Sequence, residues 1–336
     1  MTIKEIAKLA KTSRGTVDRV INNRGKVNPE TRDRILQVIK ENEYVPNEAG
    51  KFLSLKDKRL LVGVVLGSRT NYFFTNVLKG MKDTIKNKYK YVSIELLAKD
   101  VDIFNKEEII NSLDELKKEN IKILIISTSN NDEIIKKIDE MDIPVIVHSI
   151  NIECKNKIGY VGCDYFNSGE VMANMLNVIA DKNIKVAIVV GASNHQGQTL
   201  RVEGFKKELN PNFKIVSYVE GFDNDDKVYK SIKKLLDTKE VNAFCFVGGG
   251  AGGGVKAIEE KKVKPIVLTV DENPPVLEAL KNGSIIASVT QHPFTQGRKC
   301  IDLVYNYLLN KKIKDVNYLL NNSIILKSSI LPHENI

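Results

Sequence analysis

Arginine and aspartate side chains at a few isolated positions carry most of the binding chemistry that this 336-residue sequence offers. Only three arginines lie beyond residue 59, and one of them, Arg201, is expected to begin a helix just after a strand-end loop. There its planar guanidinium could grip hydroxyl or carboxylate oxygens. Asp271 ends an apolar run, and its carboxylate could accept hydrogen bonds from hydroxyl groups. These residues favour binding of a small polar molecule.

The common signatures of catalysis and metal binding are absent from the sequence. It contains no G-x-S-x-G elbow, no P-loop lysine, no H-E-x-x-H and no paired-carboxylate motif. The four cysteines are far apart without a C-x-x-C pair, and the four histidines are scattered. We therefore expect no enzyme, no metal, no cofactor and no disulfide framework.

The composition, 42% hydrophobic and 28% charged, is typical of a globular chain of two or three units. No apolar stretch approaches the roughly 18–20 residues that span a bilayer, and the opening residues lack a signal-peptide core. We expect a cytoplasmic protein with no membrane contact. Residues 1–59 hold 14 Lys and Arg against 8 Asp and Glu, which is two-thirds of the net charge of +9. This excess, rich in arginine, points to nucleic acid, although a solvated basic surface would give the same excess.

Three short helices are predicted in the first fifty residues. Thr2 and Glu5 form a capping box before the first helix, which begins at residue 3. Ser13 caps a second helix, and Asn28-Pro29-Glu30 opens a third that continues to Asn42. The tight turn between the first two helices indicates a helix-turn-helix, with Arg14 and Arg19 pointing outward from the second.

The segments TIKEIA, SRGTVDRVINN, GKVNPETR and EYVPN resemble the LacI family of bacterial transcriptional regulators. The resemblance implies that Arg14, Gly15 and Arg19 contact base edges, while the other residues position the protein on phosphates. Asp18 would then either pair with Arg14 or Arg19 or remain a solvated helix residue. The implied phosphate contacts come from Thr2, Ser13, Thr16, Asn22, Asn28, Thr31, Tyr44 and Asn47.

Residues 48–59 are predicted to be a hinge between the helix-turn-helix domain, 1–47, which we call the reading head, and a larger domain. The resemblance implies that this stretch becomes helical on the operator and that Leu53 is wedged into the minor groove. Gly50 weakens such a helix by roughly 1 kcal/mol relative to alanine, and Phe52 offers a second apolar group nearby. Packing of Leu53 against the next domain is the structural alternative.

From residue 60 onward, apolar strands alternate with amphipathic helices, which is typical of parallel sheets covered on both faces. Strands are expected at LLVGVVL, YVSIELL, ILIIS and PVIVH, and again at VAIVVG, FKIVSYV, AFCFVGG, PIVLTVD and IIASVTQ. Helices are expected at 73–87, 106–119 and 133–141. Two similar α/β halves should place their strand-end loops around a common cleft.

This larger part also resembles the effector domain of the LacI family, which looks like a two-lobed periplasmic sugar-binding protein. The matching pieces are NYFF, YVGCDYFNSG, TLRVEGF, VDEN and TQHPFTQG. Ser127, Asn151 and His195 also fall in strand-end loops, and for His195 a structural role is the favoured interpretation. The resemblance implies effector contacts from Asn71, Phe73, Phe74, Arg201, Asp271 and Gln291, to which the loop positions Ser127 and Asn151 are added.

The glycine run Gly248–Gly253 offers a different function. It matches G-x-G-x-x-G after a strand, and Asp271 follows 18 residues after Gly253, a spacing like that of a dinucleotide-binding fingerprint. However, the run lies in the middle of the second α/β half, and close backbone approach would also require small residues. A nucleotide-dependent oxidoreductase therefore remains an alternative.

Together these patterns predict a small all-α helix-turn-helix domain, 1–47, a hinge, 48–59, and an α/β two-lobed periplasmic-binding-protein-like domain, 60–336. Lobe one comprises approximately 60–161 and 292–320, and lobe two approximately 162–291 and 321–336. The expected function is that of a repressor that binds a pseudo-palindromic operator as a homodimer and senses a small polar effector, expected to be a carbohydrate, by population shift. Whether the effector releases or promotes DNA binding stays open. A transport solute-binding protein is the second alternative.

Overall fold

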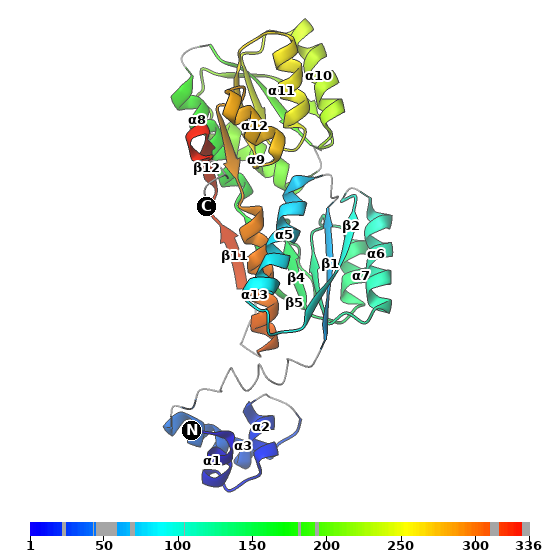
Figure 1. Ribbon diagram of the computed structural model, residues 1–336, viewed down its shortest axis with the longest axis vertical. Coiled ribbons are helices and arrows are strands. Elements are labelled where there is room, and N and C mark those ends of the chain that lie inside the picture. Colours follow the sequence, from blue (N-terminus) through cyan, green and yellow to red (C-terminus); the bar gives the residue numbers. More distant parts are fainter. Residues whose placement is uncertain are drawn as a thin grey trace. The chain divides into compact units, whose positions relative to one another are not determined.

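The computed structural model describes residues 1–21, 25–42, 44, 59–67, 71–103, 105–180, 183–191, 195–309 and 316–330. The chain divides into a small N-terminal unit and a large unit that begins at Arg59 (Figure 1). The small unit consists of three helices: α1 (Ile3–Leu9), α2 (Arg14–Ile21) and α3 (Pro29–Glu41). The predicted small all-α domain is therefore confirmed in its fold.

The three helices enclose one small core. Ile6, Ala10, Val17 and Ile35 are fully buried in it, which explains why apolar residues recur at helical spacing in this segment. Lys11, in the turn between α1 and α2, has a φ of 48°, the left-handed region that glycine adopts most readily. The turn is thus built with a lysine in a conformation that disfavours side chains.

The caps predicted for these helices are present. The amide of Glu5 donates to Thr2 Oγ1 and the amide of Thr2 donates to Glu5 Oε2, forming the reciprocal box. The amide of Thr16 donates to Ser13 Oγ over 3.1 Å, and the amide of Glu30 donates to Asn28 Oδ1 over 2.9 Å. Because each cap satisfies an amide that the helix leaves unpaired, these residues fix the helix starts.

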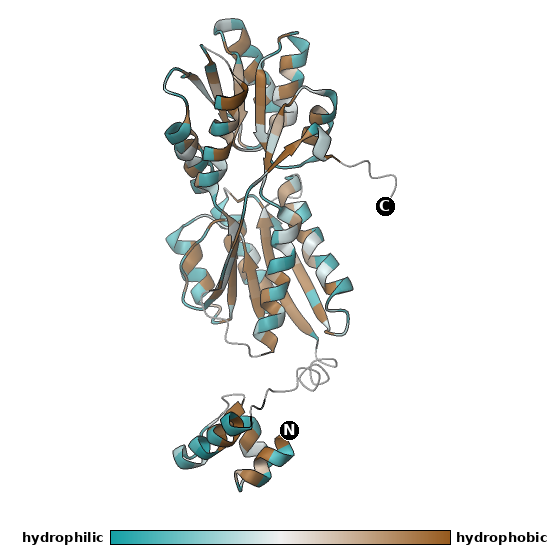
Figure 2. Cartoon of the chain, turned by 90° about the vertical axis from the view of Figure 1, so that its left-hand side faces the viewer, coloured by the Kyte–Doolittle hydropathy of each residue, from teal (hydrophilic) through white to brown (hydrophobic). Residues whose placement is uncertain are grey.

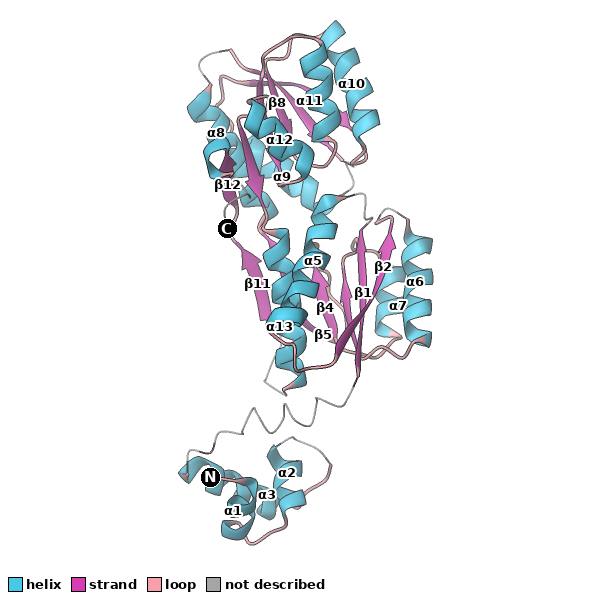
Figure 3. Ribbon diagram, viewed as in Figure 1, coloured by secondary structure: helices cyan, strands magenta, loops and turns pink. Residues whose placement is uncertain are grey.

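The first lobe of the large unit contains a sheet with the order β11-β5-β4-β3-β1-β2, in which every pair is parallel. Helices α6 and α7 lie on one face of it, and α5 and α13 on the other (Figure 3). The elements are β1 (Leu60–Gly67), α5 (Tyr72–Asn87), β2 (Ile94–Val101), α6 (Lys106–Lys118), β3 (Ile123–Ile126), α7 (Asp132–Asp139), β4 (Val145–His148), β5 (Lys157–Cys163), α13 (Pro293–Leu308) and β11 (Val316–Leu320).

The second lobe repeats this architecture with the order β12-β10-β9-β8-β6-β7, in which only β12 is antiparallel. Its inner strands are hydrophobic, whereas its helices mix hydrophobic and hydrophilic residues (Figure 2). The elements are α8 (Tyr165–Ile179), β6 (Lys185–Val190), α9 (Gln196–Glu208), β7 (Lys214–Glu220), α10 (Asp225–Thr238), β8 (Ala243–Phe246), α11 (Ala251–Glu260), β9 (Ile266–Val270), α12 (Pro274–Asn282), β10 (Ala287–Thr290) and β12 (Ser323–Leu326), followed by a single 3-10 turn, Lys327–Ser329.

The expected two-lobed α/β fold with helices on both sheet faces is confirmed. Three strands were not predicted: β5, at the crossing between the lobes, and β11 and β12, which follow α13. The outer strands β11 and β12 are short and half exposed, so their sequences lack the continuous apolar run of a buried strand. The strand expected from residue 91 begins instead at Ile94.

Each sheet is sealed by apolar residues from its neighbouring helices. Ile109, Leu113 and Ile134 from α6 and α7 pack against the first sheet, and Met172 and Phe205 from α8 and α9 against the second. Among the described residues, no helix is long and apolar enough to cross a membrane. Packing on both faces leaves the carboxyl-end loops of the two sheets as the places where polar side chains gather.

Candidate functional site

The outer face of α2 presents the residues predicted to read bases. Burial of Val17 and Val20 leaves Arg14, Gly15 and Arg19 exposed. Arg19 Nε donates to the carbonyl oxygen of Gly15 over 3.2 Å, which aligns the guanidinium along the helix. A helix face with one arginine at its first residue and a second in its last turn is suited to phosphates and guanine edges.

The polar residues predicted to contact phosphates surround this helix. Thr2, Ser13 and Asn28 use side-chain oxygens as caps, and capping leaves the Thr2 hydroxyl hydrogen and the Asn28 NH₂ group as donors. Thr16 hydrogen bonds to Ser13 through their hydroxyls at 2.9 Å, and Tyr44 packs at the edge of the small core. Thr31 is half buried in the first turn of α3. Three predicted residues lie outside the described residues: Asn22, Asn47 and Leu53.

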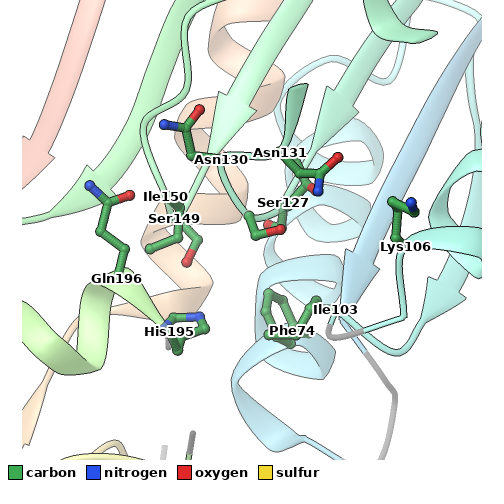
Figure 4. Close-up of a pocket in the computed structure, with 12 residues that line it drawn as sticks. Phe74, Ile103, Lys106, Ser127, Asn130, Asn131, Ser149, Ile150, His195 and Gln196 are labelled. Carbon is green, nitrogen blue, oxygen red and sulfur yellow. The ribbon is translucent and has the colours of Figure 1, made fainter. Parts of the chain in front are cut away.

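A cavity of about 460 Å³ lies between the lobes of the large unit, at the carboxyl ends of the strands. Phe74 and Ser127 line it from the first lobe and His195 from the second, and their side chains face one space (Figure 4). Several lining residues were not predicted, although the polar run after β3 was a usable signal: Ile103, Lys106, Thr128, Ser129, Asn130, Asn131, Ser149, Ile150 and Gln196.

A buried imidazole supports the first-lobe wall. Ser127 Oγ and His148 Nδ1 are 2.6 Å apart, and His148 is fully buried, which lowers its pKa to about 4. A neutral His148 can accept the hydroxyl hydrogen of Ser127, whose lone pairs then face the cavity. Phe73 stacks on His148 at 5.9 Å and meets Phe74 edge-on at 5.1 Å. Phe74 therefore lines the cavity, whereas Phe73 holds the wall behind it.

Arg201 lies inside α9 rather than at its start as predicted, because His195 caps this helix several residues earlier. It is only 4% exposed, and its Nη1 donates to the carbonyl oxygen of Val247 over 2.8 Å. Its Nε and Nη2 groups have no hydrogen-bond partner within the described part of the chain. Since an unpaired buried donor is costly, these two groups are poised for acceptor atoms of a bound molecule.

Asp271 and Gln291 lie together near this guanidinium. Gln291 Nε2 donates to Asp271 Oδ1 over 2.6 Å, and the Cys163 thiol donates to Gln291 Oε1 over 3.2 Å. Burial raises the pKa of Asp271, while the charge of Arg201 and the bond from Gln291 act in the opposite direction. Asp271 also has a φ of 72°, a conformation that proteins retain mostly where a side chain must be aimed.

The remaining predicted effector residues have local roles. Asn71 Oδ1 accepts the amide of Phe73 over 3.0 Å and so caps α5. Asn151 is exposed, accepts a hydrogen bond from Lys157 Nζ over 2.7 Å, and lines a different cavity of about 300 Å³. The structure thus does not bring Asn151 to the main cavity, because the backbone beyond β4 carries it to the opposite side of Ile150.

Comparison with known proteins identifies both parts of the chain. Residues 2–47 match the model described as bacterial regulatory proteins, lacI family, and residues 62–312 match the periplasmic binding protein domain. Catabolite control protein A of Priestia megaterium is 30% identical over 74% of this chain and 74% of that protein. The chain belongs to the LacI family of bacterial regulatory proteins.

Relatives over nearly the whole length of this LacI-family chain are regulators. The HTH-type transcriptional regulator RegA of Clostridium saccharobutylicum is 26% identical over 98% of this chain and 99% of the relative. Among solved structures, GanP, a glucose-galactose binding protein from Geobacillus stearothermophilus, has a TM-score of 0.71 at 22% identity, covering 82% of this chain and 99% of its own. A D-allose-bound solute binding protein from Actinobacillus succinogenes has a TM-score of 0.72 at 20% identity, covering 81% and 99%. Regulation is therefore favoured over transport as the function of the chain.

Backbone amides of the glycine run in this LacI-family chain donate hydrogen bonds to carboxylates of the same chain. Gly249 N donates to Asp223 Oδ1 over 2.7 Å, and Gly253 N donates to Asp225 Oδ1 over 3.0 Å. A Cβ at Gly249 would meet Asp223 Cβ at 2.9 Å and one at Gly253 would meet Asp225 O at 1.9 Å, so these glycines make room for the aspartate loop. Because carboxylates take amides that a pyrophosphate would need, this arrangement disfavours the dinucleotide alternative. Asp223 was not considered from sequence.

We expect Gly253→Ala to lower the free energy of unfolding by about 1–3 kcal/mol, because overpacking at backbone cannot be relieved by rotamer change. A Cβ at Gly253 would lie 1.9 Å from the carbonyl oxygen of Asp225. Gly252→Ala is the matched control, since its Cβ would meet only side-chain atoms of Pro275 and Asp225, at 3.0 Å and 3.1 Å. Chemical denaturation of both variants measures the difference, and equal losses would contradict the packing role.

Proposed function

We propose that this LacI-family chain is a repressor whose operator affinity is set by a small, polyhydroxylated effector, a sugar or sugar derivative, bound between the lobes. Arg201 carries the effector half of the proposal, because its buried Nε and Nη2 groups, which have no hydrogen-bond partner among the described residues, can donate to acceptor atoms of a bound molecule. Asp271 nearby would accept hydrogen bonds from hydroxyls. Phe74 would cover an apolar sugar face.

Uncharged polar residues that line the cavity between the lobes support the same ligand class, although Arg201 and Asp271 are not among its lining residues. Ser127, Ser149 and Asn130 offer hydroxyl and amide groups without net charge, and Thr128 Oγ1 is buried with no hydrogen-bond partner in the described ranges. Proteins of similar fold bind D-allose, D-arabinose and myo-inositol according to their descriptions. Hydroxyl and amide groups that can donate and accept hydrogen bonds, together with the ring of Phe74, are suited to such polyols.

The proposal assigns DNA reading to residues 1–47, the hinge to 48–59 and effector sensing to 60–336. A homodimer would place two α2 helices on a pseudo-palindromic operator, because a two-fold protein matches a two-fold site. Effector binding would favour one arrangement of the lobes and thereby change the spacing of the two reading heads. The protein would act in the cytoplasm, where the DNA lies.

A thermal unfolding screen tests the effector half. The purified chain is heated with D-allose, D-arabinose, D-glucose, D-galactose, myo-inositol or NAD. A ligand of the folded state at 100 times its dissociation constant stabilises by about 2.7 kcal/mol and raises the unfolding temperature. We expect a rise with at least one polyol and none with NAD. A rise with NAD alone would overturn the proposal in favour of the nucleotide alternative.

A further inference from the structure

Tyr165 occupies the crossing between the two lobes. It is the first residue of α8, whose later residues Met172 and Leu176 belong to the core of the second lobe. Yet Tyr165 itself is 7% exposed and packs within the apolar cluster of the first lobe, next to Ile150 and Tyr160. One side chain therefore joins the second-lobe helix to the first-lobe core.

The hydroxyl group of Tyr165 makes a specific bond to the first lobe. Its oxygen lies 2.7 Å from Ser149 Oγ. Ser149 follows β4, has a φ of 68°, and lines the cavity between the lobes. Its backbone is held independently, since Ser149 N donates to Val161 O over 3.0 Å and Tyr160 OH donates to Ser149 O over 2.7 Å. The partner of the Tyr165 hydroxyl is thus fixed to the first-lobe sheet.

The ring of Tyr165 contacts Arg201, the residue proposed to hold the effector and called the effector clamp below. The guanidinium carbon of Arg201 lies 4.8 Å from the ring centroid, within the range of a cation–π contact. The helices that carry both residues touch backbone to backbone: a Cβ at Gly169 would lie 1.9 Å from Arg201 O, and one at Gly204 would lie 2.0 Å from Phe166 O. Helices packed this closely move as one body, so Arg201 and Tyr165 shift together.

We propose that Tyr165 is the positioning residue that couples the effector clamp to the arrangement of the lobes, through its ring on Arg201 and its hydroxyl on Ser149. The proposal rests on the proposed function, because it assigns the regulatory link between cleft and DNA to one hydrogen bond. A bound acceptor that pulls on Arg201 would carry α9 and the closely packed α8 with it, and so would move the Tyr165 hydroxyl relative to Ser149. The bond therefore biases the lobe equilibrium on which operator affinity depends.

The test uses the full-length chain and three substitutions. Tyr165→Phe keeps the ring under Arg201 but removes the bond, and Ser149→Ala removes the other end of the same bond. Tyr160→Phe is the matched control, because it removes a tyrosine hydroxyl bond to the same Ser149 that stays within the first lobe. The DNA probe is the duplex that the wild-type chain enriches from a random-sequence library.

We expect Tyr165→Phe and Ser149→Ala each to change affinity for this duplex at least about fivefold, the lower end of typical allosteric coupling. A double variant that combines Tyr165→Phe with Ser149→Ala should bind the duplex with the same affinity as each single variant, because all three lack the same bond. Tyr160→Phe should bind the duplex with wild-type affinity. A purely structural role would not move this readout, because the reading head belongs to a different compact unit. Wild-type affinity in Tyr165→Phe, or an equal change in Tyr160→Phe, would overturn the proposal.

Amide hydrogen exchange separates this proposal from the proposed function. If the wild-type chain enriches no sequence, the repressor function fails, and exchange alone decides the role of Tyr165. Faster exchange in the first turn of α8 and around Ser149 for Tyr165→Phe and Ser149→Ala, about tenfold and absent from Tyr160→Phe, supports the link between the lobes. Unchanged exchange in all variants rejects it.

Discussion

Replacing Arg201 with alanine is expected to abolish the effector response while the chain still selects its DNA sequence. Two buried N–H groups of Arg201 have no hydrogen-bond partner among the described residues. Hydrogen bonds from a charged donor contribute about 1.5–3 kcal/mol each, so losing both should weaken effector binding at least about 100-fold. The sequence-reading face of α2 is untouched, so affinity for the selected duplex should persist without effector.

Arg201→Ala should also alter the pH dependence of stability. The charge of Arg201 opposes the burial that raises the pKa of Asp271, so its loss raises that pKa further. A carboxyl group with a raised folded pKa binds more protons when folded, so stability falls as pH rises from the unfolded value, about 3.9, through the folded value. The deficit in unfolding temperature relative to wild type should therefore be larger at pH 8 than at pH 4.

Two further variants make the Arg201 measurement interpretable. Arg201→Lys keeps the charge near Asp271 but lacks the planar fork, so it should restore most of the stability without restoring effector binding. Arg298→Ala removes an exposed arginine from α13 and should leave both properties unchanged. Titration of the polyol found in the thermal screen measures the affinity. If the Arg201→Ala chain binds this polyol with wild-type affinity, the effector must bind away from Arg201.

The parts of the fold that sequence predicted are those where local signals are strong. Caps at Thr2, Ser13 and Asn28 gave the reading-head helices, because each pairs one side chain with one exposed amide. The buried strands were visible as continuous apolar runs. By contrast, β11 and β12 are half-exposed edges, so their short sequences do not differ from those of loops.

Site residues were predicted where a rare residue type or a strand end marked them in the sequence. Site residues were missed where they come together only when separate loops meet in the fold. Arg201 was conspicuous because only three arginines lie beyond residue 59, and Asp271 because it directly ends an apolar run. His195 was assigned a structural role, yet it both caps α9 and lines the cavity. Asp223 was overlooked because it meets Gly249 only after two strand-end loops fold together. Contacts of this kind depend on tertiary structure that periodicity does not encode.

Arg19→Ala is expected to remove sequence selection while much of the general DNA affinity remains. Arg19 is exposed on α2 and aligned by its bond to the Gly15 carbonyl. A bidentate arginine contact to guanine discriminates against a wrong base by about 5- to 150-fold, whereas phosphate contacts spread over the domain supply sequence-independent binding. We therefore expect the affinity ratio between the selected duplex and a scrambled duplex to fall by that factor.

Two further substitutions, one at Lys8 and one at Arg19 itself, separate base reading from simple charge loss. Lys8→Ala removes one exposed positive charge from the last turn of α1 and should weaken both duplexes equally, leaving the ratio intact. Arg19→Lys keeps the charge but not the fork, so its ratio should fall nearly as far as that of alanine. Competition binding at one fixed salt concentration measures all four chains. If the Arg19→Ala ratio equals that of wild type, Arg19 acts only on phosphate and base discrimination must come from Arg14 or from the deformability of the DNA.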